Sequence, residues 1–185
     1  MMRLVLIGAP GSGKGTQGER LVAETGAQHI ATGDLLRAEQ QAGSKLGREV
    51  GGYLNSGSLV PDEVLFELVL PLVRSPAGYI LDGFPRSVAQ AERFAELTGP
   101  DTAPDRVLYL QVAKSELVAR LLRRAGEQGR PDDTEAVIRH RLQVFDEQTS
   151  PLIDYYRQRD LLAVVDGGQQ PDAVYRGLLG TLGLR

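Results

Sequence analysis

Residues 3–20, RLVLIGAPGSGKGTQGER, contain the stretch that decides the fold of this 185-residue chain. The apolar run at 3–8 lacks the polar alternation of a half-exposed strand, which favours a buried parallel strand. The segment 14–25 has the apolar spacing of a helix, and the motif GAPGSGKGT at 8–16 lies where the two meet. The sequence therefore predicts a strand, a glycine-rich loop and a helix in direct succession.

The glycine-rich motif predicts a site for phosphate groups. A helix N-terminus carries unpaired backbone amides and a partial positive charge, and glycines let those amides approach a phosphate without side-chain clashes. Lys14 adds a point charge for the β and γ phosphates of a nucleotide. The usual pattern G-x-x-x-x-G-K-[ST] has a hydroxyl after the lysine, but here Gly15 takes that place and Thr16 follows, so a magnesium contact of Thr16 is expected to run through water. A tight glycine turn between strand and helix is the alternative that the motif alone leaves open.

Composition limits the classes of function. With 42% hydrophobic residues the chain can form one core of ordinary size, so we expect one domain spanning 1–185. The formal net charge is -3 and no run of like charge is long, so neither nucleic acid nor a membrane surface is expected as a partner. The absence of cysteine excludes disulfides and thiolate zinc sites and is compatible with a reducing cytosol. The apolar run near the N-terminus is too short for a signal peptide or a membrane span.

Short apolar runs alternate along the chain with longer segments of helical periodicity. Strands are expected at 3–8, 27–31, 78–82, 106–112 and 161–166. Helices are expected near 14–25, 34–42, 62–73, 87–97, 115–125 and 134–158, with a break or kink at Pro151. Clusters of glycine, proline and polar residues predict loops at 51–61, 98–105 and 126–133. The repeated order predicts an α/β fold of three layers, in which helices flank a parallel five-stranded sheet.

A second motif, DGFPR at 82–86, follows the expected strand at 78–82. An aspartate at the carboxyl end of a parallel strand would place Asp82 beside the phosphate loop, where it could hold magnesium or its waters. Asp82 could instead cap the next helix, but Pro85 and Ser87 fit that helix start better. Arg86 would then lie at the mouth of the sheet, where open α/β folds bind ligands.

A third feature is a set of arginines whose roles depend on this context. A single exposed arginine contributes about 0 to 1 kcal/mol in a surface ion pair. In phosphoryl transfer, an arginine that stabilises the migrating charge raises the rate by about 10³ to 10⁵. Beside a phosphate loop the second role becomes the working hypothesis for these residues: Arg37, Arg120, Arg123, Arg124, Arg130, Arg139 and Arg141.

Taken together, the motifs resemble those of adenylate kinases, in the family's order and across nearly the whole chain: GAPGSGKGT, ATGDLLR, SGSLVPDE, DGFPRSVAQ, RLLRR, GRPDD and RHRL. That family has a glycine after the phosphate-loop lysine, which accounts for Gly15. The resemblance implies a P-loop kinase with a mobile lobe for the nucleoside monophosphate (NMP) at 31–60, a short lid at 124–130 and the remainder as core. It also implies the reaction MgATP + AMP ⇌ 2 ADP by direct in-line transfer, and we expect a cytoplasmic monomer.

The resemblance also assigns residues to the two nucleotides. For ATP it implies Gly11, Ser12, Gly13, Lys14, Gly15, Thr16, Arg120, Arg124 and Gln169. For AMP it implies Thr32, Arg37, Ser58, Leu59, Val60, Gly83, Phe84, Pro85, Arg86, Gln90, Arg130 and Arg141. The expected catalytic set is Lys14, Arg86, Arg124, Arg130 and Arg141. Mg²⁺ is the expected cofactor, held by Asp82 through water, with Thr16 as a second candidate.

Two side chains favour AMP as the acceptor. Gln90 offers a donor and an acceptor, the pair needed at an adenine edge, and the Thr32 hydroxyl can bond the base as well. The related UMP/CMP kinases tend to have alanine in place of Thr32 and asparagine in place of Ser87. A UMP or CMP kinase remains the nearest alternative. A nucleotide-binding module without chemistry is more distant, because it would usually carry an N-K-x-D motif, which the sequence lacks.

The chain departs from many relatives at two places. Only AGEQG separates Arg124 from Arg130, where longer lids sometimes carry four zinc ligands, so no structural zinc is expected. Near the C-terminus, VDGGQQP has glutamines where some relatives have lysine or glycine, so the Gln169 contact rests on position alone. Lobe and lid are expected to close around the substrates, with nearby glycines as hinges or as helix ends. His29 and His140 are expected to be structural.

Overall fold

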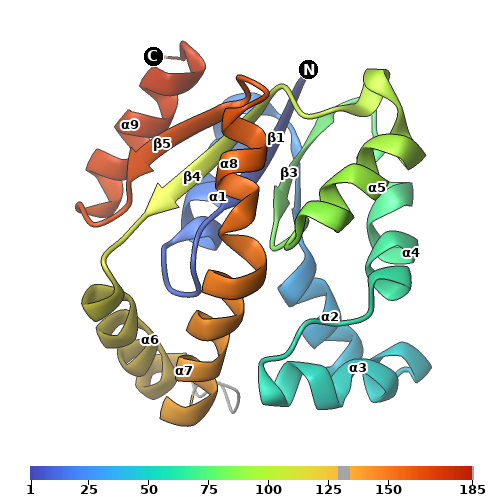
Figure 1. Cartoon of the computed structure of the whole chain (residues 1–185), viewed down its shortest axis with the longest axis vertical. Helices are drawn as coiled ribbons and strands as arrows, with labels where there is room; N and C mark the ends of the chain where they lie inside the picture. Colours follow the sequence, from blue (N-terminus) through green and yellow to red (C-terminus); the bar gives the residue numbers. More distant parts are fainter. Residues whose placement is uncertain (129–133, 185) are drawn as a thin grey trace.

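The computed structural model describes residues 1–128 and 134–184 and contains a parallel five-stranded sheet flanked by helices (Figure 1). The strands are β1 (Met2–Ile7), β2 (Gln28–Ala31), β3 (Gly78–Asp82), β4 (Arg106–Gln111) and β5 (Leu162–Asp166). Their order in the sheet is β2-β3-β1-β4-β5, and every pair is parallel. The expected three-layer α/β fold is confirmed.

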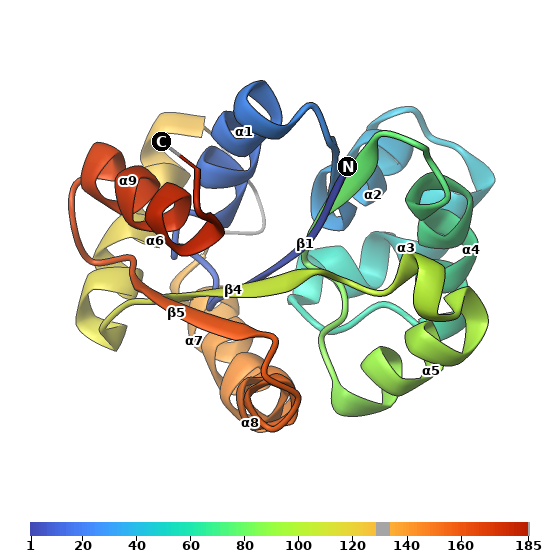
Figure 2. The same ribbon diagram turned by 90° about the horizontal axis from the view of Figure 1, so that it is seen from above.

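The side chains of β1 alternate between two hydrophobic cores. Leu4 and Leu6 belong to the core formed with α1 (Lys14–Thr25) and α9 (Pro171–Leu182). Val5 and Ile7 belong to the core on the opposite face. Seen from above, α1 and α9 lie on one side of the sheet and α8 (Pro151–Arg157) on the other (Figure 2). Because both faces are covered, the strand needs no polar alternation.

The second face of the sheet is covered by α4 (Asp62–Val73), α5 (Val88–Thr98) and α8. Aromatic rings fill this core edge to face: Phe84 lies 5.3 Å from Phe66 and 5.6 Å from Phe94 between ring centroids. The Ser87 side chain caps α5 by accepting a hydrogen bond from the Gln90 amide at 3.1 Å. The expected start of this helix is therefore confirmed, and Asp82 is not its cap.

The segment after β2 forms two helices, α2 (Thr32–Gln41) and α3 (Lys45–Ser56). The expectation of a loop at 51–61 is wrong for 51–56, and the reason lies in helix packing. A Cβ added to Gly47 would lie 2.1 Å from the Glu39 carbonyl oxygen, so this glycine permits close contact between α2 and α3. The helix has ordinary start and stop signals: Ser44 caps it, and Gly57 ends it with a φ of 77°.

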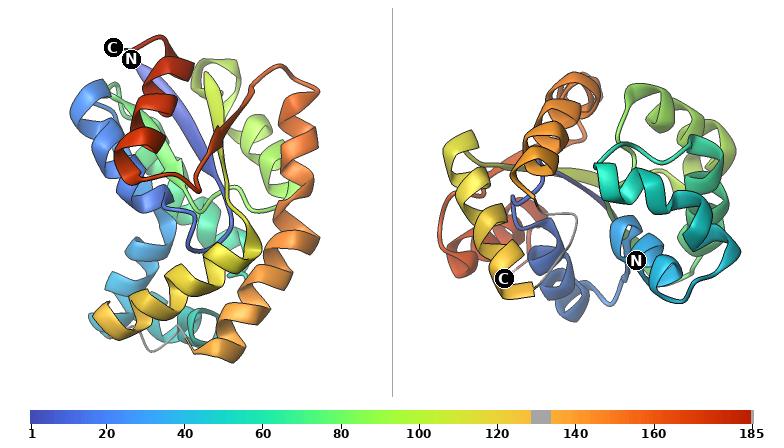
Figure 3. Two further views of the ribbon diagram at one scale, coloured as in Figure 1. Left: turned by 90° about the vertical axis from the view of Figure 1, so that its left-hand side faces the viewer. Right: turned by 90° about the horizontal axis from the view of Figure 1, so that it is seen from below.

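Two long helices follow β4, namely α6 (Lys114–Gln128) and α7 (Glu135–Val144). The expected loop at 126–133 is wrong for 126–128, which continue α6, and its remaining residues, 129–133, lie outside the described residues. A π-helical turn, η2 (Phe145–Thr149), connects α7 to α8. The Ser150 amide donates to the Phe145 carbonyl at 2.8 Å, and Pro151 begins α8, as its missing N–H favours. In side view, α7, η2 and α8 form one long helical run (Figure 3).

Helix α9 was not expected from the sequence. Its glycines weaken the helical pattern, but Pro171 at its start and Gly183 just past its end are ordinary helix signals.

A short 3-10 helix, η1 (Pro100–Thr102), lies within the expected loop at 98–105. Within the described part of the chain, no helix combines the length and the apolar character that a membrane crossing requires.

Candidate active site

A cavity of ≈ 780 Å³ lies at the carboxyl ends of β1 and β3. Its walls come from the loop 8–13 and the start of α1, from the start of α2, from the connection between α3 and α4, and from α6, α7 and the loop after β5. In the sheet register Leu6 pairs with Asp82, so the glycine-rich loop and the DGFPR motif begin side by side. Ligands of open α/β sheets bind at this edge, where the strand order changes direction.

The loop 8–13 leads into α1 through two glycines with left-handed backbone angles. Gly11 has a φ of 83° and Gly13 a φ of 92°, a region that other residues rarely adopt. Among the described side chains, none caps the N-terminus of α1. The first amides of this helix therefore face the cavity as donors for an anion.

The side chain of Lys14 folds back onto the loop 8–13. Its Nζ donates to the carbonyl oxygens of Gly8 at 2.8 Å and of Ala9 at 3.2 Å. Burial lowers the pKa of Lys14, and the nearby Arg86 and Arg124 act in the same direction, against the opposing charge of Asp82. An anionic ligand would offset this cost of burying cations, so the local charge favours phosphate groups.

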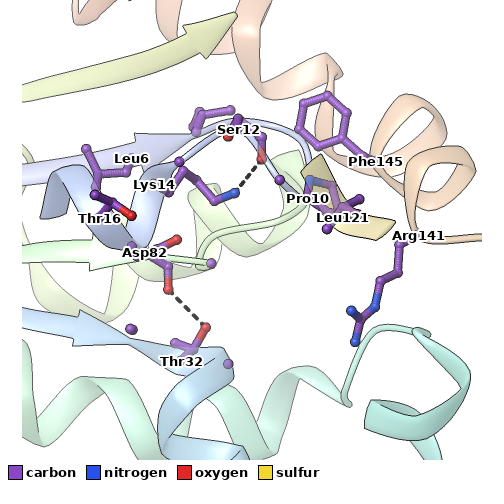
Figure 4. A pocket seen from close by; sticks show the side chains of 18 of the residues that line it. Leu6, Pro10, Ser12, Lys14, Thr16, Thr32, Asp82, Leu121, Arg141 and Phe145 are labelled. Carbon is purple, nitrogen blue, oxygen red and sulfur yellow. Dashed lines mark hydrogen bonds between the residues drawn. The ribbon is translucent and has the colours of Figure 1, made fainter. Parts of the chain in front are cut away.

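Asp82 lies across from Lys14 in the same cavity (Figure 4). Burial alone would raise the pKa of Asp82, but the neighbouring His29 and the charges of Lys14 and Arg86 outweigh it and hold the pKa below its ordinary value. His29 Nε2 lies 3.9 Å from Asp82 Oδ2. A Cβ added to Gly15 would be 3.8 Å from the same oxygen, so the carboxylate lies directly against the phosphate loop.

This donor set suits a magnesium ion that enters with a nucleotide. Magnesium usually binds one or two carboxylates and keeps phosphate oxygens and waters as its other ligands. Asp82 supplies one carboxylate, and Thr16 is exposed in the same cavity. Over residues 1–128 and 134–184, no group of three or more histidines and acids is placed to hold a metal on its own.

Arg86 is partly buried and lines the cavity. Its Nε donates to the Gly83 carbonyl at 2.7 Å, and its own carbonyl accepts a bond from Thr149 Oγ1 at 2.9 Å. Burial lowers the pKa of Arg86, and the charges of Arg141 and Arg37 add to this against Asp82. Arg141 enters the cavity from α7, and its Nη2 donates to the Leu54 carbonyl at 3.4 Å (Figure 4). Three arginines from distant parts of the chain therefore face one volume.

Most of the residues assigned from the sequence line this one cavity, including the segment 58–60, Thr32, Arg37, Arg124 and Gln169. Two do not. Phe84 packs in the core with Phe66 and Phe94, and Gln90 is 1% exposed and does not line the cavity. Arg130 lies outside the described residues.

Thr32 and Arg120 are already engaged by the protein. The Thr32 hydroxyl donates to the Asp82 carbonyl at 3.2 Å, so only its lone pairs remain for a ligand (Figure 4). Arg120 donates to the carbonyls of Gly167 at 2.9 Å and Gly168 at 3.4 Å. Arg120 thus fixes the loop that contains Gln169. The Gln169 side chain donates a hydrogen bond to Asp166 at 3.1 Å.

Sequence reasoning missed three contacts of the site. Thr149 is buried and holds the Arg86 backbone, yet nothing local in its π-helical turn marks it. His29 was assigned a structural role only, but it lies against Asp82. His140 Nε2 lies 3.4 Å from Ser58 Oγ, which joins α7 to the expected NMP lobe.

These features define a class, the P-loop phosphotransferases: a phosphate loop, a carboxylate beside it, and arginines around one shared cavity. The family model described as adenylate kinase matches residues 6–161. Adenylate kinases of Maricaulis maris and Stenotrophomonas maltophilia are 47% and 45% identical to this chain, with alignments covering 98% of it and 98% and 99% of their own lengths. An adenylate kinase of a Synechococcus species is 50% identical over 86% of this chain and 87% of its own. The chain belongs to the adenylate kinase family and is a phosphotransferase.

Proposed function

We propose that this chain catalyses MgATP + AMP ⇌ 2 ADP by direct in-line phosphoryl transfer. The observation that carries the proposal is the meeting of Lys14, Asp82 and Arg86 in one cavity, at the ends of two neighbouring strands. The start of α1, with its helix N-terminal amides, lines this cavity together with Arg37 and the segment 58–60. Such a site can hold two phosphate-bearing ligands end to end.

In the forward step an oxygen of the AMP phosphate forms a bond to the γ-phosphorus of ATP. The bond from that phosphorus to the β–γ bridging oxygen breaks, and its electron pair stays on the ADP that leaves. Lys14 and Arg86 hold the charge as it moves, with Arg124, Arg130 and Arg141 in the same proposed role. When bound, Mg²⁺ would neutralise charge on the phosphates, and Asp82 with Thr16 would hold it.

The nucleotide positions follow the same division of the cavity. ATP would lie on the loop 11–16, with Arg120, Arg124 and Gln169 around it. AMP would lie between Thr32, Arg37, the segment 58–60 and residues 83–86, with its base near Gln90. We further propose that the lobe 31–60 and the lid 124–130 close over both, so that the phosphoryl group reaches AMP and not water.

We also propose that the enzyme works as a monomer in the cytoplasm. The site needs no residue from a second chain for the roles described above. Size-exclusion chromatography with light scattering should give a mass near the 20.0 kDa of the chain. A stable dimer at working concentration would contradict this part of the proposal.

The first experiment incubates the purified chain with ADP and magnesium alone. We expect ATP and AMP to appear in equal amounts by chromatography, and chelation of the metal to stop the reaction. ADP that remains intact would contradict the proposal. A panel with ATP and AMP, UMP or CMP then separates the adenylate kinase from the pyrimidine kinase alternative, since only AMP should be turned over efficiently.

Arg86→Ala tests the site itself. We expect kcat to fall by about 10³-fold or more, because a cation next to the transferred group is lost. Arg139→Ala is the matched control: the sequence grouped Arg139 with the candidate arginines, but it does not line the cavity, and its side chain is 73% exposed and pairs with Glu135 on α7. Circular dichroism checks that both variants fold. Unchanged turnover in Arg86→Ala would sink the proposed mechanism.

A further inference from the structure

The side chain of Gln90 is clamped at both ends. The Arg86 backbone amide donates to Gln90 Oε1 at 2.7 Å, and Gln90 Nε2 donates to Asp62 Oδ1 at 2.6 Å. A backbone N–H can only donate and a carboxylate can only accept. The two neighbours therefore impose the same orientation on the amide, with its oxygen toward Arg86 and its nitrogen toward Asp62.

The clamp leaves a defined hydrogen-bonding pattern. A glutamine amide has two N–H donors and two lone pairs on its oxygen. After the two bonds of the clamp, one N–H and one lone pair remain, and they cannot exchange places unless both bonds break. A freely rotating amide could present either order to a ligand, whereas this one presents a single order.

We infer that Asp62 is a specificity-determining residue of the acceptor site, because it holds Gln90 in the orientation that matches a 6-aminopurine and opposes a 6-oxopurine. Adenine offers a 6-amino donor next to the N1 acceptor, whereas hypoxanthine offers a 6-oxo acceptor next to an N1–H donor. The inference rests on the proposed function, in which Gln90 lies at the base of AMP. Mismatched polar groups in a buried site discriminate strongly, since each is left without a partner.

The position of Asp62 supports this role. It is the first residue of α4 and directly follows Pro61, so it is attached to the segment 58–60 in the cavity wall. Gln90 lies in the first turn of α5, beyond the DGFPR motif. The bond between them joins the start of α4 to the start of α5, 28 residues further along the chain. Asp62 thereby acts through Gln90 as a positioning residue and does not need to touch the nucleotide.

The test compares kcat/KM for AMP with kcat/KM for inosine monophosphate, the 6-oxo analogue. Asp62→Ala and Asp62→Leu remove the acceptor, and we expect the AMP-to-IMP ratio to fall at least ten-fold. Asp62→Asn keeps an acceptor oxygen and is expected to retain the ratio within about three-fold. Glu63→Ala is the matched control: it removes the other first-turn acid of α4 and leaves the clamp intact, so the ratio should not change.

Gln90→Ala separates the two ways in which the inference can fail. If Gln90→Ala collapses the ratio and neither Asp62→Ala nor Asp62→Leu changes it, Gln90 reads the base without help and the role of Asp62 is overturned. If Gln90→Ala also leaves the ratio unchanged, the base is read elsewhere and both the inference and the proposed position of AMP fail. The AMP-to-IMP ratio of each variant is measured on folded protein. If Asp62→Ala does not fold, the apolar Asp62→Leu replaces it in the comparison.

Discussion

Gly18 shows how a single atom can matter to the site. It lies within α1, where glycine costs about 0.5–1 kcal/mol relative to alanine. A Cβ added to Gly18 would lie 2.5 Å from His29 Nε2. Glycine at this position therefore lowers the stability of the helix but leaves space for the imidazole. Through Gly18 the histidine keeps its place against Asp82.

Gly18→Ala is therefore expected to lower activity. The displaced His29 would no longer hold the Asp82 carboxylate, and loss of such a supporting contact costs about ten-fold or more. Steady-state kinetics across magnesium concentrations should show the loss, with a higher magnesium requirement. Normal kinetics would mean that His29 does not position Asp82.

The control is another helical glycine, Gly52 in α3. Outside its own helix, no heavy atom of the described residues lies within 4 Å of a Cβ added there. Gly52→Ala should stabilise the protein by about 0.5–1 kcal/mol in urea unfolding and leave kcat unchanged.

The residues of the site differ in how far the sequence could reveal them. Lys14 and Asp82 were predictable because Asp82 ends a strand and Lys14 follows one after a short loop, and the carboxyl ends of parallel strands share one edge. The bond from Gln90 to Asp62 and the bond from Thr149 to Arg86 were not, because these partners lie 28 and 63 residues apart in sequence. Contacts of that range depend on packing, which a local pattern does not contain.

Among the elements, α9 illustrates a helix whose stability comes from packing. Its glycines give it a weak intrinsic preference for the helical conformation. Leu178 is nevertheless completely buried in the core that contains Leu4 and Leu6 of β1, and Gln17 of α1 donates to the Pro171 carbonyl at 3.0 Å. The same reason explains why α3 and α9 were missed: their glycines resemble loop signals until the neighbouring elements are in place.

Leu178→Ala should cost about 2–5 kcal/mol in the free energy of unfolding, because it leaves a cavity in the α1–α9 core. Leu122→Ala is the comparison, since Leu122 is 45% exposed and should change stability by less than about 0.5 kcal/mol. Chemical denaturation at 25 °C measures both. Equal costs would contradict the placement of α9 on the sheet.

The junction between β1 and β4 carries a pH-dependent contact. Arg3 donates to Asp105 through its backbone amide at 2.7 Å and its Nη2 at 2.6 Å. Burial alone would raise the pKa of Asp105, but these hydrogen bonds and the charge of Arg3 hold it below its ordinary value. A depressed pKa stabilises the fold above the pKa of the unfolded chain, and the contribution is lost as the pH falls through the folded value.

Asp105→Asn is therefore expected to destabilise the protein at pH 7 by about 1 kcal/mol, a modest figure because the carboxylate is partly exposed. The difference from the parent chain should shrink as the pH falls from the pKa of the unfolded aspartate through the lower folded value, because the Asp105 carboxyl then becomes neutral, as asparagine already is. Urea unfolding at several pH values tests this, and a difference that stays constant with pH would contradict it.

At the scale of the whole molecule, α3 and α7 approach each other at the end away from the chain termini (Figure 1). Ser58 contacts His140, and a Cβ at Gly57 would lie 2.7 Å from Arg141 Cγ. The proposed lobe and α7 therefore touch in this structure, across the cavity that the substrates must enter.

A covalent link between the proposed lobe and α7 should slow turnover. Ser56 bonds Ser58, which contacts His140, and the chain has no cysteine of its own. In the double variant Ser56→Cys, His140→Cys, a short cleavable maleimide linker should lower kcat at least ten-fold, and cleavage should restore it. Full activity in the linked enzyme would mean that the lobe need not move. Each single-cysteine variant, treated with the same reagent, is the control.

Arg120 ties α6 to the loop after β5 through the carbonyls of Gly167 and Gly168. A rotation of α6 that stretches these bonds would also move this loop, which we propose contacts the adenine of ATP. Binding at the loop and the position of α6 are then linked equilibria, and linkage is reciprocal. A nucleoside without phosphates that binds the loop more tightly in one position of α6 would shift α6 toward that position, and a mutation that shifts α6 in the same direction would raise the affinity for that nucleoside.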